Sequence, residues 1–185
     1  MQTLFIEKEI KYTGAQLKPH WIYRNFNILG DCIVSFTGEV DVKISQMVDI
    51  EDVINDDSIY SKKMLNFIIE CFSTPLKEMV VIQRLFISII KETLEKRGKK
   101  VLRKGDDLYF DNRKLSVSIA TKSITSSLIH TALNIIKEGA LIEAADLSEL
   151  GIYDIKGFSI DVMDSFASEM KSMKNAVCKV RGVVE

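Results

Sequence analysis

Residues 105–134 constrain the fold of this chain most, because they alternate apolar and polar side chains with the period of a β-strand. Side chains two positions apart on a strand point to the same side of its sheet. The stretch predicts two strands joined by a tight turn, then a linker and a third strand. After the turn, alternation places Leu115, Val117 and Ile119 on a core face and Lys114, Ser116 and Ser118 on a polar one.

The third predicted strand has a polar face of its own. His130, Ala132 and Asn134 alternate with Ile129, Thr131 and Leu133. Polar groups are costly to bury without partners, so both polar faces need either hydrogen bonds or a solvent-filled space. If these strands lie side by side, their polar faces form a cleft.

Two short segments in this region resemble known enzyme families. Residues 106–109 (DDLY) followed by 113–115 (RKL) resemble the Asn-Asp-Leu-Tyr … Arg-Lys-Leu-Ala-Gly signature of biotin protein ligases. Residues 128–134 (LIHTALN) resemble the His-Gly … Leu-Asn strand of lipoate ligases and octanoyl transferases, with a gap one residue shorter.

Nearly the whole chain is similar to an archaeal and bacterial family known as domain of unknown function 366. The similarity lies in residues 20–26 (HWIYRNF), 30–31 (GD), 47–52 (MVDIED) and 105–107 (GDD). Together the resemblances imply an α+β fold of the biotin/lipoate ligase-like (class II synthetase-like) type, a mostly antiparallel sheet with packed helices. They assign no reaction.

The ligase resemblance implies roles for individual residues. Lys114 matches a lysine that contacts carboxyl or acyl-phosphate oxygens, and His130 joins it as the second candidate catalytic residue. Asp106 takes the place of an asparagine near magnesium, so it is the candidate Mg²⁺ ligand, with ATP or an acyl-adenylate as the implied cofactor. The candidate cofactor-binding residues are Arg24, Ser116, Ser118 and Asn134.

Each of these residues also has a purely structural interpretation. Most strand lysines face solvent, and a single histidine on a strand is more often hydrogen-bonded in the core than catalytic. The segment holding Arg24 and His20 is equally typical of a surface turn anchored by Trp21. The acidic residues 47–57 are typical of the first turn of a helix.

Departures from the ligase pattern leave two functions open. Residues 29–42 contain one glycine, Gly38, where ligases carry a glycine-rich or arginine-glycine loop over the adenylate. Val117 replaces a ligase glycine, and residues 142–146 lack the nucleophilic cysteine of octanoyl transferases. The chain is therefore either an acyl ligase or acyltransferase, or a non-catalytic small-ligand sensor that kept the cleft.

Composition narrows the class of protein. A length of 185 residues predicts one domain, residues 1–185, and a net charge of −1 argues against nucleic-acid and membrane partners. The three cysteines are Cys32, Cys71 and Cys178; they are far apart and odd in number, which favours free thiols in a reducing cytoplasm. We also expect homo-oligomerisation, because sheet edges and an amphipathic helix leave apolar surface to cover.

Periodicity predicts further elements. In chain order they are a β-run at 4–12, a strand pair at 29–42 turning at Thr37-Gly38, a helix beginning within 47–57, helices at 61–72 and 79–97, an edge strand at 99–103, helices at 144–150 and 159–175, and a last strand at 178–181.

Overall fold

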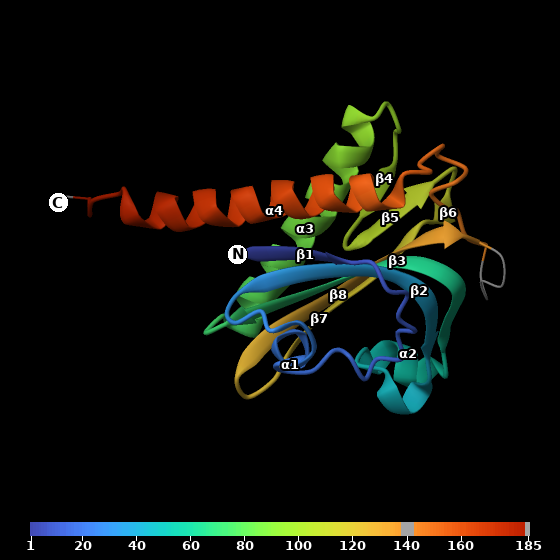
Figure 1. Ribbon diagram of the computed structural model, residues 1–185, viewed down its shortest axis with the longest axis horizontal. Helices are drawn as coiled ribbons and strands as arrows, with labels where there is room; N and C mark the ends of the chain where they lie inside the picture. Colours follow the sequence, from blue (N-terminus) through green and yellow to red (C-terminus); the bar gives the residue numbers. More distant parts are fainter. Residues whose placement is uncertain (138–142, 184–185) are drawn as a thin grey trace.

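The computed structural model describes residues 1–137 and 143–183, which form two β-sheets with helices packed on them (Figure 1). The larger sheet has five strands, in spatial order β1 (Gln2–Ile6), β2 (Cys32–Val42), β3 (Ile59–Phe72), β8 (Ser126–Ile136) and β7 (Ser116–Lys122). The smaller sheet is formed by β4 (Leu102–Lys104), β5 (Asp107–Phe110) and β6 (Arg113–Lys114). Only the β1–β2 pair is parallel among these described strands. The predicted α+β fold with a mostly antiparallel sheet is confirmed.

Both faces of the five-stranded sheet are covered. The helices are α1 (Trp21–Phe26), α2 (Ile50–Asn55), α3 (Leu76–Lys96) and α4 (Ile155–Cys178), with a short 3₁₀ turn η1 (Ile44–Gln46). Figure 1 shows α4 above the sheet and α1 and α2 below it. Leu65 and Phe67 of β3 join the core under α3 and α4, whereas Met64 and Ile68 join a second core on the other face. A strand buried on both faces carries apolar residues without alternation.

That double burial explains a wrong prediction. Residues 61–72 were expected to be helical, but they form β3, the central strand. A short, continuous apolar run fits a buried helix and a buried strand equally well. Its partners β2 and β8, distant in sequence, decide the outcome.

Gly38 does not make the turn that the sequence predicted. Residues 32–42 form the single strand β2, with a register shift between Gly38 and Val40. A Cβ atom at Gly38 would lie 2.0 Å from the carbonyl oxygen of Ile10. The glycine is therefore needed where the N-terminal segment runs parallel to β2 and packs closely against it.

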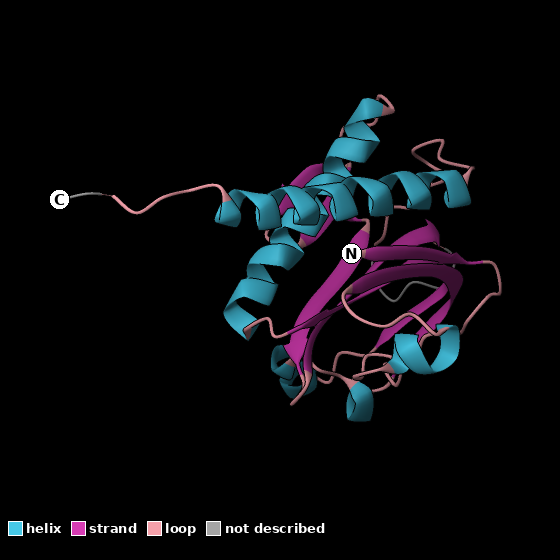
Figure 2. Ribbon diagram, turned by 60° about the vertical axis from the view of Figure 1, so that its left-hand side comes forward, coloured by secondary structure: helices cyan, strands magenta, loops and turns pink. Residues whose placement is uncertain are grey.

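The predicted helices at 79–97 and 159–175 are confirmed as α3 and α4, and the acidic segment begins α2 with Asp49 as its N-cap. The two long helices cross (Figure 2). Phe86 of α3 contacts Phe166 of α4, with ring centroids 4.9 Å apart. Residues 144–150 form a bridge and turns rather than a helix, and no strand forms at 178–181. Among the described residues, no helix has the length and apolarity that crossing a bilayer requires.

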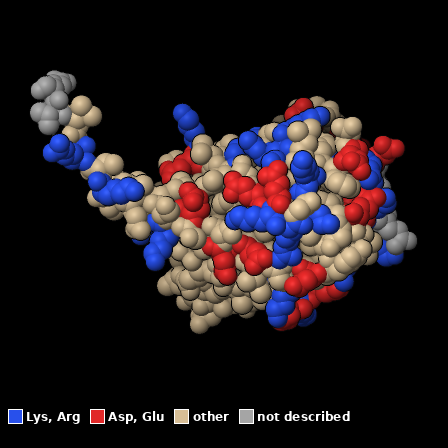
Figure 3. Space-filling view, turned by 90° about the horizontal axis from the view of Figure 1, so that it is seen from above, with Lys and Arg blue, Asp and Glu red and all other residues tan. Residues whose placement is uncertain are grey.

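Charged side chains are mixed on the outer surface. Figure 3, which views the molecule from above, shows basic and acidic side chains interspersed on that face.

Candidate functional site

A cleft of about 540 Å³ lies on the α1–α2 side of the sheet, within the size range of small-molecule sites. Its walls come from three parts of the chain. They are β7 and β8 of the large sheet, the β5–β6 hairpin with the residues just before it, and the segment from Gln46 to Ser61 that contains α2. Tyr12 and Val40 close it toward the second core.

Lys114 lines this cleft and is held in place by a carboxylate. Its Nζ lies 2.9 Å from Oδ2 of Asp107, and both side chains are partly buried. Burial raises the pKa of Asp107, while the hydrogen bond from Lys114 opposes that rise. The hairpin brings the two together because Lys114 and Asp107 lie on its paired strands, with Tyr109 directly opposite Lys114. Asp111 and Asn112 make the tight turn with positive φ at both positions, as a type I′ hairpin requires.

The predicted alternation fails at Leu115. The N–H of Leu115 bonds to Leu108 in the small sheet, while its carbonyl accepts the N–H of Asn134 in the large one. Leu115 is thus the point at which the chain passes between sheets. Leu115 and Ser116 both face the helical core, and Ser116 lies opposite Leu133.

This shift exchanges the faces of the strand that follows. Val117 and Ile119 lie opposite Ala132 and His130 on the cleft side, so the prediction that they share the core face with Leu115 is wrong. Strict alternation holds only while a strand stays in one sheet.

Ser116 and Ser118 still reach the cleft, because β7 is an edge strand and the cleft extends around it. Ser116 Oγ accepts the Leu108 N–H at 2.9 Å, which fastens the hairpin to β7. Ser118 Oγ lies 2.8 Å from the hydroxyl of Thr131 and accepts a hydrogen bond from Gln83 at 2.9 Å. The serines therefore serve the framework of the site as well as its wall.

Two side chains of α3 donate hydrogen bonds to the carboxylate of Asp106. Arg84 donates to its Oδ1 at 2.8 Å, and Gln83 donates to its Oδ2 at 3.0 Å. Both carboxylate oxygens therefore already have donors. The described residues also include no group of three or more His, Cys, Asp or Glu placed to hold a metal ion. The side chains around Asp106 do not fit a ready-made magnesium site, and we assign no chemical step to a metal there.

His130 lies at the base of the cleft and is 5% exposed. Its ring stacks on Tyr12, with centroids 3.7 Å apart and planes 12° from parallel. Its Nε2 is 3.0 Å from Oδ1 of Asn66, whose amide nitrogen donates to the Met64 carbonyl. Oδ1 of Asn66 must therefore accept, and Nε2 carries the hydrogen. Burial lowers the pKa of His130 to about 3, so the ring is neutral near pH 7.

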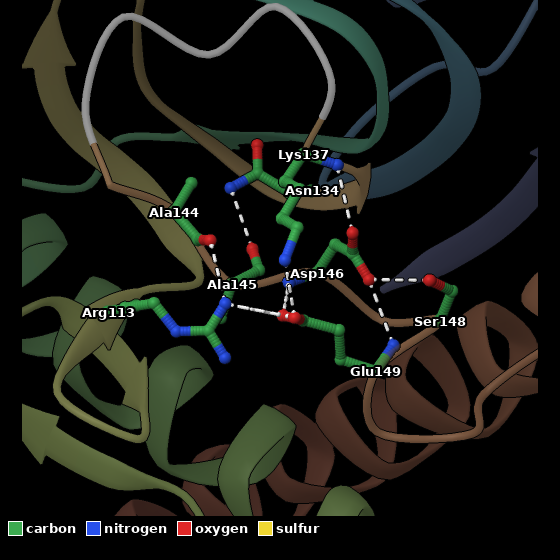
Figure 4. Close-up of polar contacts among 8 residues, drawn as sticks. All are labelled: Arg113, Asn134, Lys137, Ala144, Ala145, Asp146, Ser148 and Glu149. Carbon is green, nitrogen blue, oxygen red and sulfur yellow. Dashed lines mark hydrogen bonds and ion pairs between the residues drawn. The ribbon is translucent and has the colours of Figure 1, made fainter.

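Asn134 links the cleft to the loop beyond it. Its Oδ1 accepts from the Ser61 hydroxyl at 3.3 Å, and its Nδ2 donates to the carbonyl of Ala145 at 3.0 Å (Figure 4). Ala144, next to Ala145, lines the cleft. The amide thus positions one end of the cavity wall.

An ion-pair network holds residues 144–149 in place (Figure 4). Arg113 donates to both carboxylate oxygens of Glu149, at 2.9 and 3.0 Å, and Lys137 donates to Glu149 at 2.6 Å. These hydrogen bonds lower the pKa of Glu149 to about 2. Asp146 accepts from the backbone N–H of Lys137 and from the hydroxyl of Ser148. The network ties β6, β8 and the loop together.

The wall opposite Lys114 is acidic. Asp49, Asp52, Asp56 and Asp57 line it from the α2 segment. Burial, and then the neighbouring Asp49, raise the pKa of Asp52, whereas the charge of Lys114 lowers it. Lys114 and Asp52 are therefore close enough across the cleft to influence each other.

Arg24 does not belong to the described cleft lining. It is exposed on α1, which follows His20. The backbone N–H of His20 donates to Glu70 and its ring stacks on Phe72. These contacts lie at the far end of β3, whereas Ser61 and Met64 line the cleft. The structure thus brings six predicted residues together, Lys114, Ser116, Ser118, His130, Asn134 and Asp106, and leaves Arg24 apart.

Sequence reasoning missed two parts of the site. Tyr12 carries no motif and reaches the cleft because the N-terminal segment pairs in parallel with β2, with Tyr12 opposite Val40. The acids around α2 stand out in the sequence, but their pattern indicates only the start of a helix. The available signal was their number, because this segment holds more carboxylates than the N-terminus of one helix needs.

A solved structure with high similarity to this chain is described as a protein of unknown function from Pyrococcus horikoshi. The two are 38% identical, with a TM-score of 0.93 and 99% of each chain covered.

Ligases share the fold at lower identity. The biotin protein ligase from Aquifex aeolicus, solved with biotin and ATP, has a TM-score of 0.63 and 16% identity over 94% of this chain and 72% of its own. A lipoate-protein ligase A, solved with bound ATP, has a TM-score of 0.60 and 13% identity over 92% of this chain and 86% of its own. At such identities the likeness establishes the fold alone, and it confirms the biotin/lipoate ligase-like architecture. The model of the family described as Domain of unknown function (DUF366) matches residues 1–181, and the chain belongs to that family.

Proposed function

We propose that the cleft beside Lys114 binds a small carboxylic acid or its acyl-adenylate, and that the protein ligates or transfers the acyl group. Lys114 carries this proposal, because it is the one cationic side chain among the described residues that line the cleft. A fixed cation stabilises negative charge that develops on an acyl or phosphate oxygen. The contact with Asp107 at 2.9 Å keeps Nζ at the wall of the cleft.

The other polar residues fit a binding role. His130 is neutral and held by Asn66, and a group with so low a pKa accepts protons poorly near neutral pH. We therefore assign His130 to ligand contact rather than proton transfer. Ser116, Ser118 and Asn134 shape the wall through the hydrogen bonds already described. The bound biotin and ATP of the A. aeolicus ligase support an activated acyl compound as the ligand class.

Two measurements test this function. Small molecules that co-purify with the protein, identified by mass spectrometry, name candidate acids. ATP–pyrophosphate exchange with pooled carboxylic acids then reports acyl activation. Lys114→Ala is expected to weaken an acidic ligand by about 1.5–3 kcal/mol, the size of a charge-assisted hydrogen bond.

Lys122→Ala is the matched control. Lys122 lies at the exposed end of β7, outside the described cleft lining, and its loss should leave binding unchanged. Equal affinity of an acidic ligand for Lys114→Ala and the native protein would show that the site assignment is wrong.

A second candidate, a non-catalytic sensor of the same ligands, is favoured by two observations. Gly38 is packed under Ile10 rather than placed in a phosphate-binding loop, and Asp106 is engaged by Arg84 and Gln83. Backbone N–H groups need glycine-rich loops to crowd around a phosphate. A ligand that binds with Lys114 dependence but gives no pyrophosphate exchange would identify the sensor.

A further inference from the structure

The cleft carries more negative charge than its own ion pairs neutralise. Six aspartates and one lysine line it: Asp49, Asp52, Asp56, Asp57, Asp106, Asp107 and Lys114. Arg84 pairs with Asp106, and Lys114 pairs with Asp107. Asp49 accepts the N–H of Glu51 as a helix cap.

The other three aspartates have no such side-chain partner in the described part of the chain. Asp52, Asp56 and Asp57 form no ion pair with any described residue. Like charges gathered at one wall repel each other, and the pKa of Asp52 is raised first by its burial and second by this repulsion. A cation in the cleft would relieve that repulsion.

A second, independent observation comes from the base of the cleft. Tyr12 is 3% exposed and His130 is 5% exposed, and both line the cavity. The Tyr12 hydroxyl and the His130 Nδ1 have no hydrogen-bond partner among the described residues. No fully enclosed side-chain nitrogen or oxygen lacks a partner in the described structure, so both atoms must open onto the cleft.

The hydrogen-bonding capacity of these two atoms determines which ligand groups can bind to them. Since Nε2 of His130 carries the hydrogen, Nδ1 offers a lone pair. The phenolic oxygen of Tyr12 can also accept. Hydrogen-bond acceptors at the base therefore combine with carboxylates on one wall, which suits a group rich in N–H donors.

We propose that the acyl ligand of this cleft carries a protonated amine, which binds between the α2 aspartates and the His130–Tyr12 pair while its carboxyl end meets Lys114. The inference rests on the proposed function, since it assumes that Lys114 holds the acyl end. It narrows the substrate class from carboxylic acids in general to amino-substituted carboxylic acids.

A fragment pair tests this directly. γ-Aminobutyrate and butyrate share a carbon chain and differ by the amine. The chain has two histidines, so the imidazole NMR signals of His130 report the cleft and those of His20 serve as internal control. We expect γ-aminobutyrate to shift His130 with a dissociation constant lower than that of butyrate by about tenfold or more.

Variants test the amine end and the carboxyl end of the ligand independently. Asp52→Asn should reduce the preference for the amine by about tenfold, one charge-assisted contact. Asp164→Asn is the matched control, because Asp164 is exposed on α4, on the other face of the sheet. Lys114→Ala should weaken both fragments alike. Folding of each variant is checked by the unchanged spectrum of His20.

The outcomes distinguish this inference from the proposed function. Butyrate binding with Lys114 dependence but no preference for the amine would overturn the inference and leave the proposed function standing. Amine preference that depends on Asp52 but not on Lys114 would overturn the proposed function and, with it, the placement of the ligand's carboxyl end at Lys114. If neither fragment shifts His130 at about 50 mM, a concentration at which very weak sites fill, both fail. Magnesium chloride that displaces the amine and reproduces its shift would show that the acids hold a metal cation, which also overturns the inference.

Discussion

At the scale of single residues, Gly38 shows how closely the N-terminal segment packs against β2. A Cβ atom there would meet the Ile10 carbonyl oxygen at 2.0 Å and its carbon at 2.7 Å. Both are backbone atoms, which cannot rotate away as a side chain can. The N–H of Ile10 also donates to the carbonyl of Thr37, so a backbone hydrogen bond holds the segment against β2.

We therefore predict that Gly38→Ala destabilises the fold by about 1–3 kcal/mol, the usual cost of overpacking. Urea unfolding followed by circular dichroism measures the change in free energy. Gly182→Ala is the control, because a Cβ atom there has no neighbour within 4 Å. Equal stabilities of the two variants would mean that the N-terminal segment does not pack against Gly38 as described.

Residue identities in the site were predictable from sequence, but their faces were not. Six of the seven predicted site residues line one cleft. Four of them lie on the paired strands β7 and β8, and the β5–β6 hairpin brings Asp106 and Lys114 to the same space. The change of sheet at Leu115 reversed the expected faces of β7. Nothing in the local alternation records such a change, since it depends on hydrogen bonds to β5 and β8.

At the scale of elements, pairing between distant segments decided between helix and strand where the local hydrophobic pattern could not. Both α3 and α4 were predictable, because amphipathic stripes of more than three turns identify helices. The central strand β3 was predicted as a helix, since its burial between β2 and β8 removes the alternation of a half-buried strand. Tyr12 reached the cleft in the same non-local way.

Residues 144–149, which come after β8 in the chain, are held by the ion pairs of Glu149, so their contribution to stability is sensitive to pH. Hydrogen bonds from Lys137 and Arg113 lower the pKa of Glu149 from 4.5 to about 2. The unfolded chain therefore binds this proton at higher pH than the folded one. The stabilisation is complete above pH 4.5 and is lost as the pH falls toward 2.

Glu149→Gln should accordingly lose less stability than the native protein between pH 4.5 and 2, although it starts less stable. Free energies of unfolding measured at several pH values in that window give the comparison. Glu169→Gln, an exposed position on α4, should keep the native slope. Parallel slopes for native protein and Glu149→Gln would contradict the role of the network.

At the scale of the whole molecule, the fold was predictable from the resemblance to biotin and lipoate ligases. Which face of the sheet carries the long helices and which carries the cleft was not predictable. The chain places α3 and α4 on one face of the sheet and the cleft on the other, an arrangement that no single segment encodes. The second half of α4 extends away from the sheets (Figures 1 and 2). Homo-oligomerisation remains a prediction, which light scattering can test.

The same two-faced architecture keeps the cysteines apart. Cys32 lies in the core beside the cleft and Cys71 in the core under the helices, so the sheet separates their side chains although they are on adjacent strands. Both are 1% exposed, and burial raises the pKa of each thiol to about 12. Cys178, at the end of α4, is exposed.

We predict that one thiol of the native protein reacts rapidly with Ellman's reagent and that all three react after unfolding, without added reductant. The thiolate is the reacting species, so burial and a high pKa protect Cys32 and Cys71 together. Cys178→Ser should abolish the rapid phase and leave two thiols that appear only on unfolding. Two rapid thiols in the native protein would show that one face of the sheet is open to solvent, and fewer than three in the unfolded chain would reveal a disulfide that this arrangement of layers forbids.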